Sequence, residues 1–148
     1  MEYNIDMSSC NLCDRDRHVI ARNEHWALCL NDDQAFLGRC FFVLNRHETD
    51  VTVLTQAERD SLWELAASAK GALDMLFQPD HYNYAFLMNL TPHVHMHIIP
   101  RYGGARSFSG VTFVDERFNS HYDASAQAIL AEDVQIALSE AIRGAMKS

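Results

Sequence analysis

Short apolar stretches bounded by turn residues recur five times along the first hundred residues. This pattern predicts strands, because a strand that is half or fully buried needs a run of apolar side chains between turns. The residues Asn31-Asp-Asp33 and Gly38 mark two of the turns. The predicted strands cover residues 19–20, 26–30, 40–44, 82–88 and 93–99.

Two segments instead show helical spacing. Thr55-Gln-Ala-Glu58 is a capping box, and apolar residues follow it at helical intervals, so a helix is predicted over about residues 56–77, ended by Pro79-Asp80. A second helix is predicted over about residues 123–147. Strands followed by a long helix and a terminal helix indicate an α+β fold with a mostly antiparallel sheet. The buried stripe predicted for the second helix comprises Leu130, Val134, Ala137, Leu138, Ala141 and Met146.

Three histidines occupy alternate positions in the segment His93-Val-His-Met-His-Ile-Ile99. On a strand they would share one face, about 6.5 Å apart at each step. There are three possible explanations: chance exposure on an edge strand, a three-histidine metal site, and a nucleophilic imidazole that attacks phosphorus. The strict alternation weighs against chance. A single metal ion is disfavoured because the outer pair would lie about 13 Å apart at the backbone.

The composition limits the class of protein. A chain of 148 residues with 48% hydrophobic content fits one domain, here residues 1–148. Its formal charge of −8 argues against binding to nucleic acid polymers, although a local basic site could still bind a small phosphate ligand. The amino terminus lacks a secretory signal and no apolar run is long enough to span a membrane, so a cytoplasmic protein is expected.

Four cysteines in a cytoplasmic chain are poor evidence for disulfides. Cys29 and Cys40 lie in apolar stretches and are expected to be buried. Cys10 and Cys13 form a C-x-x-C pair, which suits a zinc site or a redox pair. The redox reading is disfavoured because no strand precedes the motif, which leaves a metal site and chance both open.

The segment His93-Val-His-Met-His-Ile-Ile99 resembles the signature of the histidine-triad (HIT) family of nucleotide hydrolases and transferases. The resemblance extends over a core of about residues 10–102, and bacterial members are similar to "HMHIIPRY". It implies a five-stranded antiparallel sheet with one long helix, here followed by a carboxy-terminal helix, and a homodimer with a continuous sheet. It also implies cleavage at the α-phosphorus of a nucleotide through a nucleotidyl-histidine intermediate.

The resemblance further implies roles for individual residues. His95 matches the nucleophile, and His97 would lie near the transferred phosphate. Asn31 matches a ribose-binding position and Asn89 a phosphate-binding position, although without the family turn chemistry would be the preferred explanation of both residues. Zinc-containing members bind a structural zinc ion through residues that match Cys10, Cys13, His47 and His93.

Two departures from the family pattern affect substrate recognition. No Gly-Gln loop fits between Asn89 and His93, so contacts to the leaving group must differ. Arg39 stands where many members have histidine, and it either binds phosphate or pairs with Asp32 or Asp33. Beyond the triad, Arg101 and Arg106 are further candidates for phosphate contacts, with solvated surface as the alternative.

The sequence therefore predicts an enzyme that hydrolyses nucleotides. Dinucleoside polyphosphates such as diadenosine tetraphosphate are the first expected substrates, and nucleoside phosphoramidates the second. Nucleotidyl transfer to phosphate, and a non-catalytic protein that binds nucleotide and zinc, are the alternatives.

Overall fold

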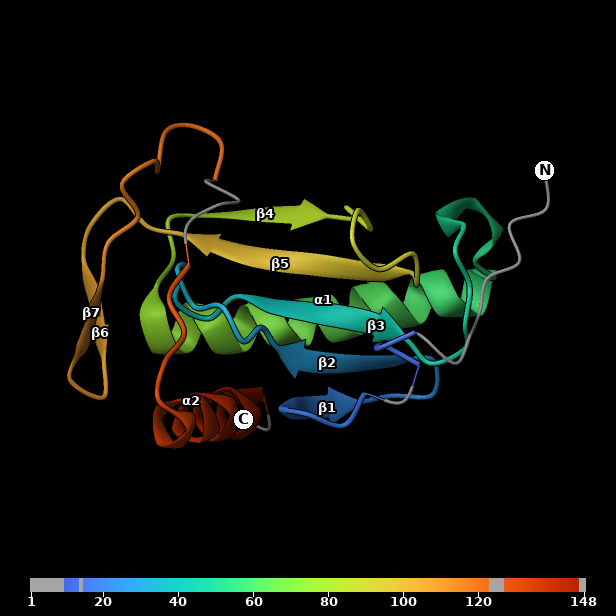
Figure 1. Ribbon diagram of the computed structural model, residues 1–148, viewed down its shortest axis with the longest axis horizontal. Helices are drawn as coiled ribbons and strands as arrows, with labels where there is room; N and C mark the ends of the chain where they lie inside the picture. Colours follow the sequence, from blue (N-terminus) through green and yellow to red (C-terminus); the bar gives the residue numbers. More distant parts are fainter. Residues whose placement is uncertain (1–9, 14, 123–126, 147–148) are drawn as a thin grey trace.

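An antiparallel sheet of five strands, in the order β1-β2-β3-β5-β4, forms the centre of the molecule (Figure 1). The computed structural model describes residues 10–13, 15–122 and 127–146. Every neighbouring pair of strands is antiparallel, which confirms the predicted α+β fold class. The strands are β1 (Val19–Arg22), β2 (Trp26–Leu30), β3 (Cys40–Leu44), β4 (His81–Ala85) and β5 (His95–Arg101).

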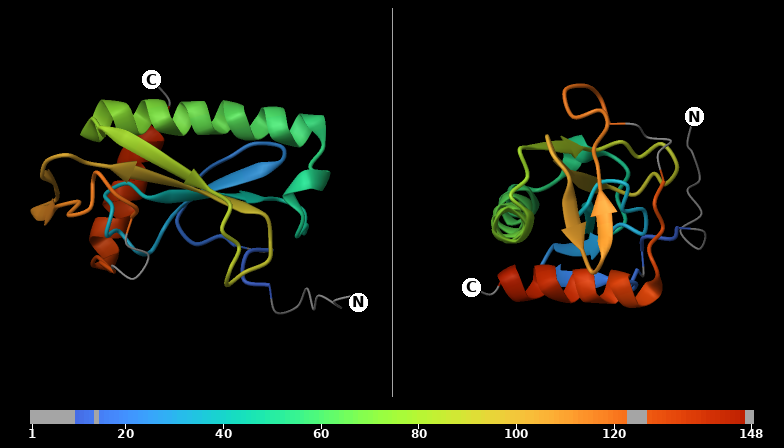
Figure 2. Two further views of the ribbon diagram at one scale, coloured as in Figure 1. Left: turned by 90° about the horizontal axis from the view of Figure 1, so that it is seen from above. Right: turned by 90° about the vertical axis from the view of Figure 1, so that its left-hand side faces the viewer.

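The long helix α1 (Gln56–Phe77) covers one face of this sheet (Figure 2). Thr55 and Glu58 form the predicted capping box, and the helix ends where Gln78 turns left-handed at φ 46°. The predicted bounds of this helix are confirmed. A short 3-10 turn, η2 (Val51–Val53), precedes it.

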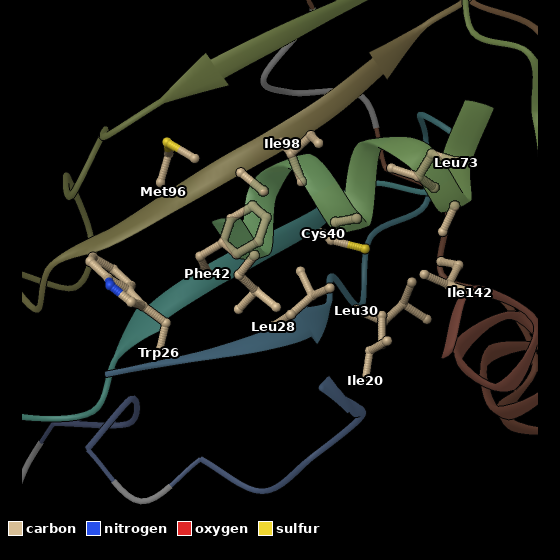
Figure 3. Packing of buried hydrophobic residues seen from close by; sticks show 14 of the residues in the cluster. Ile20, Trp26, Leu28, Leu30, Cys40, Phe42, Leu73, Met96, Ile98 and Ile142 are labelled. Carbon is tan, nitrogen blue, oxygen red and sulfur yellow. The ribbon is translucent and has the colours of Figure 1, made fainter. Parts of the chain in front are cut away.

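The main core lies between α1 and the sheet (Figure 3). Trp26, Leu28 and Phe42 point from β2 and β3 toward α1, and each is fully buried. A smaller cluster lies on the opposite face, where Leu12 of the amino-terminal arm packs on Phe41. Because β2 and β3 are covered on both faces, their sequences are continuous runs of apolar residues. Cys29 and Cys40 are buried in them, as expected.

Two predicted strands have different ends in the structure. The strand predicted to end at Met88 stops at Ala85, and Met88 itself has a positive φ of 51°, which strand geometry does not allow. The strand predicted to begin at His93 begins at His95. His93 therefore lies just before β5. The next residue, Val94, donates a hydrogen bond to the carbonyl of Glu48 and accepts one from the amide of Leu44.

The carboxy-terminal helix α2 (Glu132–Met146) begins later than predicted. Residues 123–126 and 147–148 lie outside the described residues. Residues 127–131 are extended because Ala128 exchanges hydrogen bonds with the loop after β2, donating to Asp33 Oδ1 and accepting from the Gln34 amide. The helix lies under the β1 edge of the sheet and reaches α1 (Figure 2). Its fully buried residues are Gln135, Leu138, Ser139 and Ile142. Of the predicted stripe, Leu138 is fully buried, and Leu130 and Met146 are partly buried against the main core.

A hairpin of β6 (Arg106–Phe108) and β7 (Val111–Phe113) extends from the end of β5 and was not predicted. Its two-residue turn has positive φ at both Ser109 and Gly110, which matches the right-handed twist of a hairpin. In the described part of the chain, the helices are too short or too polar to cross a membrane.

Candidate active site and metal centre

The face of the sheet opposite α1 presents two of the three alternating histidines. His95 and His97 lie on this face, with ring centroids 5.1 Å apart, while Met96 and Ile98 point into the main core. Phe41 of the neighbouring strand β3 lies beside them, and its ring centroid is 6.2 Å from each imidazole. Alternate residues of β5 therefore point to opposite faces of the sheet, with the two histidines on one face and the core residues Met96 and Ile98 on the other.

His95 is held in one orientation by its own strand. It is only 8% exposed, and its Nδ1–H donates to the carbonyl of His93 at 2.7 Å. An imidazole that carries its proton on Nδ1 keeps the lone pair on Nε2. This arrangement prepares Nε2 of His95 to act as a nucleophile.

His97 is held in its neutral form. Burial, the nearby positive charge of Arg39 and the imidazole of His95 together lower the pKa of His97 to about 3, with burial the largest cause. Its Nδ1 is buried and has no hydrogen-bond partner among the described residues. At neutral pH, this side chain therefore offers an uncharged imidazole to whatever binds on the face.

We expect the His97 ring to resist protonation in the ligand-free protein. The unfolded chain protonates this histidine near pH 6.5, whereas the native chain does so only near pH 3, so the native state loses stability as the pH falls below about 6.5. An NMR titration of the imidazole signals measures this directly. The His97 signal should stay in its neutral position from pH 7 to pH 5, and a midpoint near 6.5 would contradict the described geometry.

A second group of side chains lies just before the amino end of β5, next to His95. Cys10, Cys13, His47 and His93 place one ligand atom each within 4.8 Å of one another, and they are the one such group found among the described residues. His93 Nδ1 lies 3.3 Å from Cys10 Sγ, 3.6 Å from Cys13 Sγ and 3.2 Å from His47 Nδ1. His47 Nδ1 lies 3.1 Å from Cys13 Sγ.

These distances fit a tetrahedral metal site. A zinc ion with the usual bond lengths would separate its nitrogen ligands by about 3.3 Å and a nitrogen from a sulfur by about 3.5 Å. The tautomer of His93 also fits, because its Nε2–H donates to the carbonyl of Leu44 at 2.8 Å and leaves Nδ1 free to bind the metal. The cluster could therefore bind a metal ion, which favours the metal explanation of the C-x-x-C pair over chance.

Three separate elements bring these ligands together. The two cysteines flank a turn of the amino-terminal arm, which is anchored by the buried side chain of Leu12. His47 follows β3, where its neighbour Arg46 donates two hydrogen bonds to Glu58 at the start of α1. His93 is fully buried just before β5. The metal cluster therefore uses only the first histidine of the triad and leaves His95 and His97 outside it.

The residues predicted to contact substrate lie in different surroundings. Asn31 follows β2 and its Oδ1 accepts from the amide of Asp33, which is the turn chemistry considered as the alternative. Asn89 is exposed in the loop that leads to His93. The Arg39 guanidinium is 3.9 Å from Asp33, which confirms a loose ion pair, and its charge acts on His97.

Arg101 is not available to a substrate. It is 1% exposed and uses all five N–H groups on Asp115, Asn83 and the carbonyls of Arg117 and Ser120. This network ties the segment after β7 to the end of β5. We therefore leave Arg101 out of the proposed site, in correction of the sequence prediction. The guanidinium of Arg106 likewise donates hydrogen bonds to backbone carbonyls, the shortest of them to Phe77.

One residue of this face was missed by the sequence analysis. Arg15 lies two positions after the C-x-x-C pair, and its guanidinium carbon is 4.8 Å from the centre of the Phe41 ring. Proximity to the cysteines is the one signal in the sequence that could have pointed to it. Neither its charge nor its spacing distinguishes it from the other arginines of the arm.

Comparison with known proteins agrees with this geometry. Residues 14–104, well over half of the chain, match the HIT domain family. No curated protein matches the chain as a relative.

Solved structures share the fold over nearly the whole chain. A hypothetical histidine triad nucleotide-binding protein from Sulfolobus tokodaii strain7 superposes with a TM-score of 0.71 at 14% identity, covering 93% of this chain and 92% of that one. A Zn-bound histidine triad family protein from Mycobacterium smegmatis gives 0.67 at 16% identity, covering 95% and 94%. A histidine triad protein from Sinorhizobium meliloti 1021 gives 0.69 at 18% identity, covering 93% and 98%.

Proteins of this family bind nucleotides and are generally nucleotide hydrolases or transferases. The chain described here belongs to the HIT domain family.

Proposed function

We propose that this protein is a nucleotide hydrolase in which His95 attacks the α-phosphorus of its substrate. The observation that carries the proposal is the hydrogen bond from His95 Nδ1–H to the carbonyl of His93, because it leaves the Nε2 lone pair directed away from the strand. The first substrates by resemblance are dinucleoside polyphosphates such as diadenosine tetraphosphate, and nucleoside phosphoramidates come second.

The reaction would take two steps. In the first, Nε2 of His95 forms a bond to the α-phosphorus while the bond from phosphorus to the leaving group breaks, and the leaving group departs with the electron pair. In the second, water attacks the same phosphorus, the phosphorus–nitrogen bond breaks, and the nucleoside monophosphate is released. Splitting one displacement into two in this way is the usual advantage of a covalent intermediate.

His97 would stabilise the charge that develops on the phosphoryl oxygens. Its ring adjoins that of His95, so a phosphate bound to one would be close to the other. A bound phosphate raises the pKa of a neighbouring imidazole, so substrate would oppose the effect of Arg39 and favour a proton on His97. Asn31, Asn89 and Arg39 would supply the remaining contacts to ribose and phosphate.

The metal cluster would hold a structural zinc ion. Cys10, Cys13, His47 and His93 would fill all four positions of a tetrahedral site, which leaves no open position for water or substrate. Such an ion contributes stability and ties the amino-terminal arm to the strand that carries His95. The zinc bound by the related protein from Mycobacterium smegmatis supports this choice of metal.

We further propose that the protein is cytoplasmic and works as a homodimer, as the resemblance to the family implies. Its single HIT domain would comprise a core of about residues 10–102 and a carboxy-terminal extension.

A panel of adenylated compounds tests the function. The purified protein is incubated with diadenosine tetraphosphate, an adenosine phosphoramidate and adenylylated controls in ¹⁸O-labelled water, and the products are identified by mass spectrometry. Hydrolysis at the α-phosphorus predicts adenosine monophosphate that carries the label. Adenosine diphosphate formed with added phosphate would show transfer instead, and binding without any turnover would show a non-catalytic protein.

A further inference from the structure

The ring of Phe41 is bordered by two arginines as well as by the two histidines. In the sheet, β3 lies between β2 and β5, so Phe41 pairs with Cys29 on one side and with His97 on the other. Arg15 lies over the ring from the β2 side, at 4.8 Å from its centre. Arg39 stands two residues before Phe41 and therefore on the same face of the sheet.

Neither guanidinium group is fully satisfied, although Arg15 also contacts the thiol of Cys29. The Nε atoms of Arg15 and Arg39 are buried and have no hydrogen-bond partner within the residues that the structure describes. A buried donor without an acceptor destabilises the folded protein, and more so when it is charged. The two side chains are also largely enclosed, at 17% and 13% exposure. Surface arginines in contact with water would carry no such cost.

The nearby carboxylates make only long ion pairs with these two arginines. Arg15 Nη2 is 3.8 Å from Asp32, whose Oδ1 also accepts a closer hydrogen bond from Arg17 at 3.1 Å. Arg39 Nη1 is 3.9 Å from Asp33, and the other carboxylate oxygen of Asp33 accepts from the amides of Ala35 and Ala128. Both carboxylates therefore have shorter hydrogen bonds to other groups, and their distances to Arg15 and Arg39 are close to the longest that an ion pair allows. The arginines keep donors that a ligand could use.

The surroundings of the pair favour an anionic ligand. On this face Arg39 lies near the neutral imidazole of His97 on β5 and near Tyr122 from the segment after β7. The chain as a whole carries a formal charge of −8, so two enclosed cations beside the triad stand out against its general charge. Guanidinium groups match phosphate oxygens in geometry and can bind them through paired hydrogen bonds.

We propose that Arg15 and Arg39 form an oligophosphate-binding site that holds the part of the substrate beyond the phosphorus attacked by His95. The proposal rests on the proposed function and makes it more specific, since it selects a leaving group that carries several phosphates over an uncharged amine. The two arginines determine specificity, and the chemical step remains with the histidines. The site also supplies contacts in place of the Gly-Gln loop, for which the chain has no room.

Substrate preference tests the pair in the active protein. We expect Arg15→Gln and Arg39→Gln each to lower kcat/KM for diadenosine tetraphosphate by about tenfold to a hundredfold, since a hydrogen bond to a charged group contributes about 1.5–3 kcal/mol. The loss for an adenosine phosphoramidate should be at least tenfold smaller. Arg59→Gln, on α1 and exposed on the other side of the sheet, is the matched control and should change neither value. Equal losses for both substrates would overturn the proposal.

Binding of inorganic tripolyphosphate gives a reading that does not depend on catalysis. Calorimetry on the His95→Ala protein should show one site per chain, weakened about tenfold or more by Arg39→Gln or Arg15→Gln and unaffected by Arg59→Gln. Near-ultraviolet circular dichroism confirms that each variant is folded. If tripolyphosphate binds in this way but no adenylated compound is turned over, the proposed function fails and the anion site stands. If turnover occurs but neither Arg15→Gln nor Arg39→Gln weakens tripolyphosphate binding, the proposed anion site is wrong and the proposed function stands.

Discussion

Replacing His95 by alanine should abolish turnover of the preferred adenylated substrate, with a loss of about 10⁴-fold to 10⁶-fold in kcat, as is typical when a nucleophile is removed. The physical reason is the loss of an imidazole whose Nδ1–H is fixed by a backbone carbonyl, so that its Nε2 keeps the lone pair. His97→Ala should cost less, about 10²-fold to 10⁴-fold, because it removes charge stabilisation or proton transfer and leaves the nucleophile in place. Single-turnover rates measured by product formation give both values.

The matched control for these variants is His121→Ala. His121 is exposed in the segment after β7, so its removal should leave turnover unchanged. All three variants should retain the far-ultraviolet circular dichroism of the parent protein. Substantial activity in folded His95→Ala would contradict the proposed mechanism.

Replacing both Cys10 and Cys13 by serine should remove one metal ion per chain and lower the melting temperature. Serine hydroxyls are poor zinc ligands at neutral pH, and the remaining two histidines cannot hold the ion alone. Turnover should fall only partly, because His95 and its hydrogen bond to His93 remain. Metal content by mass spectrometry and a thermal melt measure the two effects.

The competing idea places a catalytic metal on the three triad histidines. It predicts that the double serine variant keeps its metal and that His95→Ala loses it. The described geometry predicts the reverse, since His93 faces the cysteines while His95 and His97 lie farther along β5. Metal that survives the loss of both cysteines would contradict the assignment of the cluster.

The long helix could be predicted to the residue because its signals are local. Thr55 and Glu58 satisfy each other's backbone amides at the start, and Pro79 prevents continuation beyond the end. The strands β2 and β3 were equally clear, since both are apolar runs closed by turn residues. Such elements depend on neighbours in the sequence, which a single sequence contains.

The carboxy-terminal part could not be predicted in the same way because distant contacts determine it. The start of α2 depends on Asp33, which holds the backbone near Ala128 extended. The polar residues Gln135 and Ser139 lie on the buried face of that helix, and Gln135 accepts a hydrogen bond from Arg17 across more than a hundred residues. Hydrophobic spacing alone therefore predicts only part of the buried face.

The same distinction applies to the site. The triad and the C-x-x-C pair could be found from their spacing, and the structure brings His93 to the cysteines as the resemblance implied. The sequence could not show which arginines are structural and which lie on the triad face, because this depends on contacts with distant parts of the chain. Arg101 is taken up by Asp115, whereas Arg15 reaches the triad face through the fold of the arm.

A nucleotidyl group attached to His95 can be observed directly. The protein is mixed with its preferred adenylated substrate and quenched in base within milliseconds, since phosphorus–nitrogen bonds of histidine are labile in acid, and the digested peptides are analysed by mass spectrometry. The proposed mechanism predicts one adenylyl group on His95, formed and lost at rates that match turnover, and none in His95→Ala. Turnover without any adduct, or an adduct on another residue, would contradict the central claim.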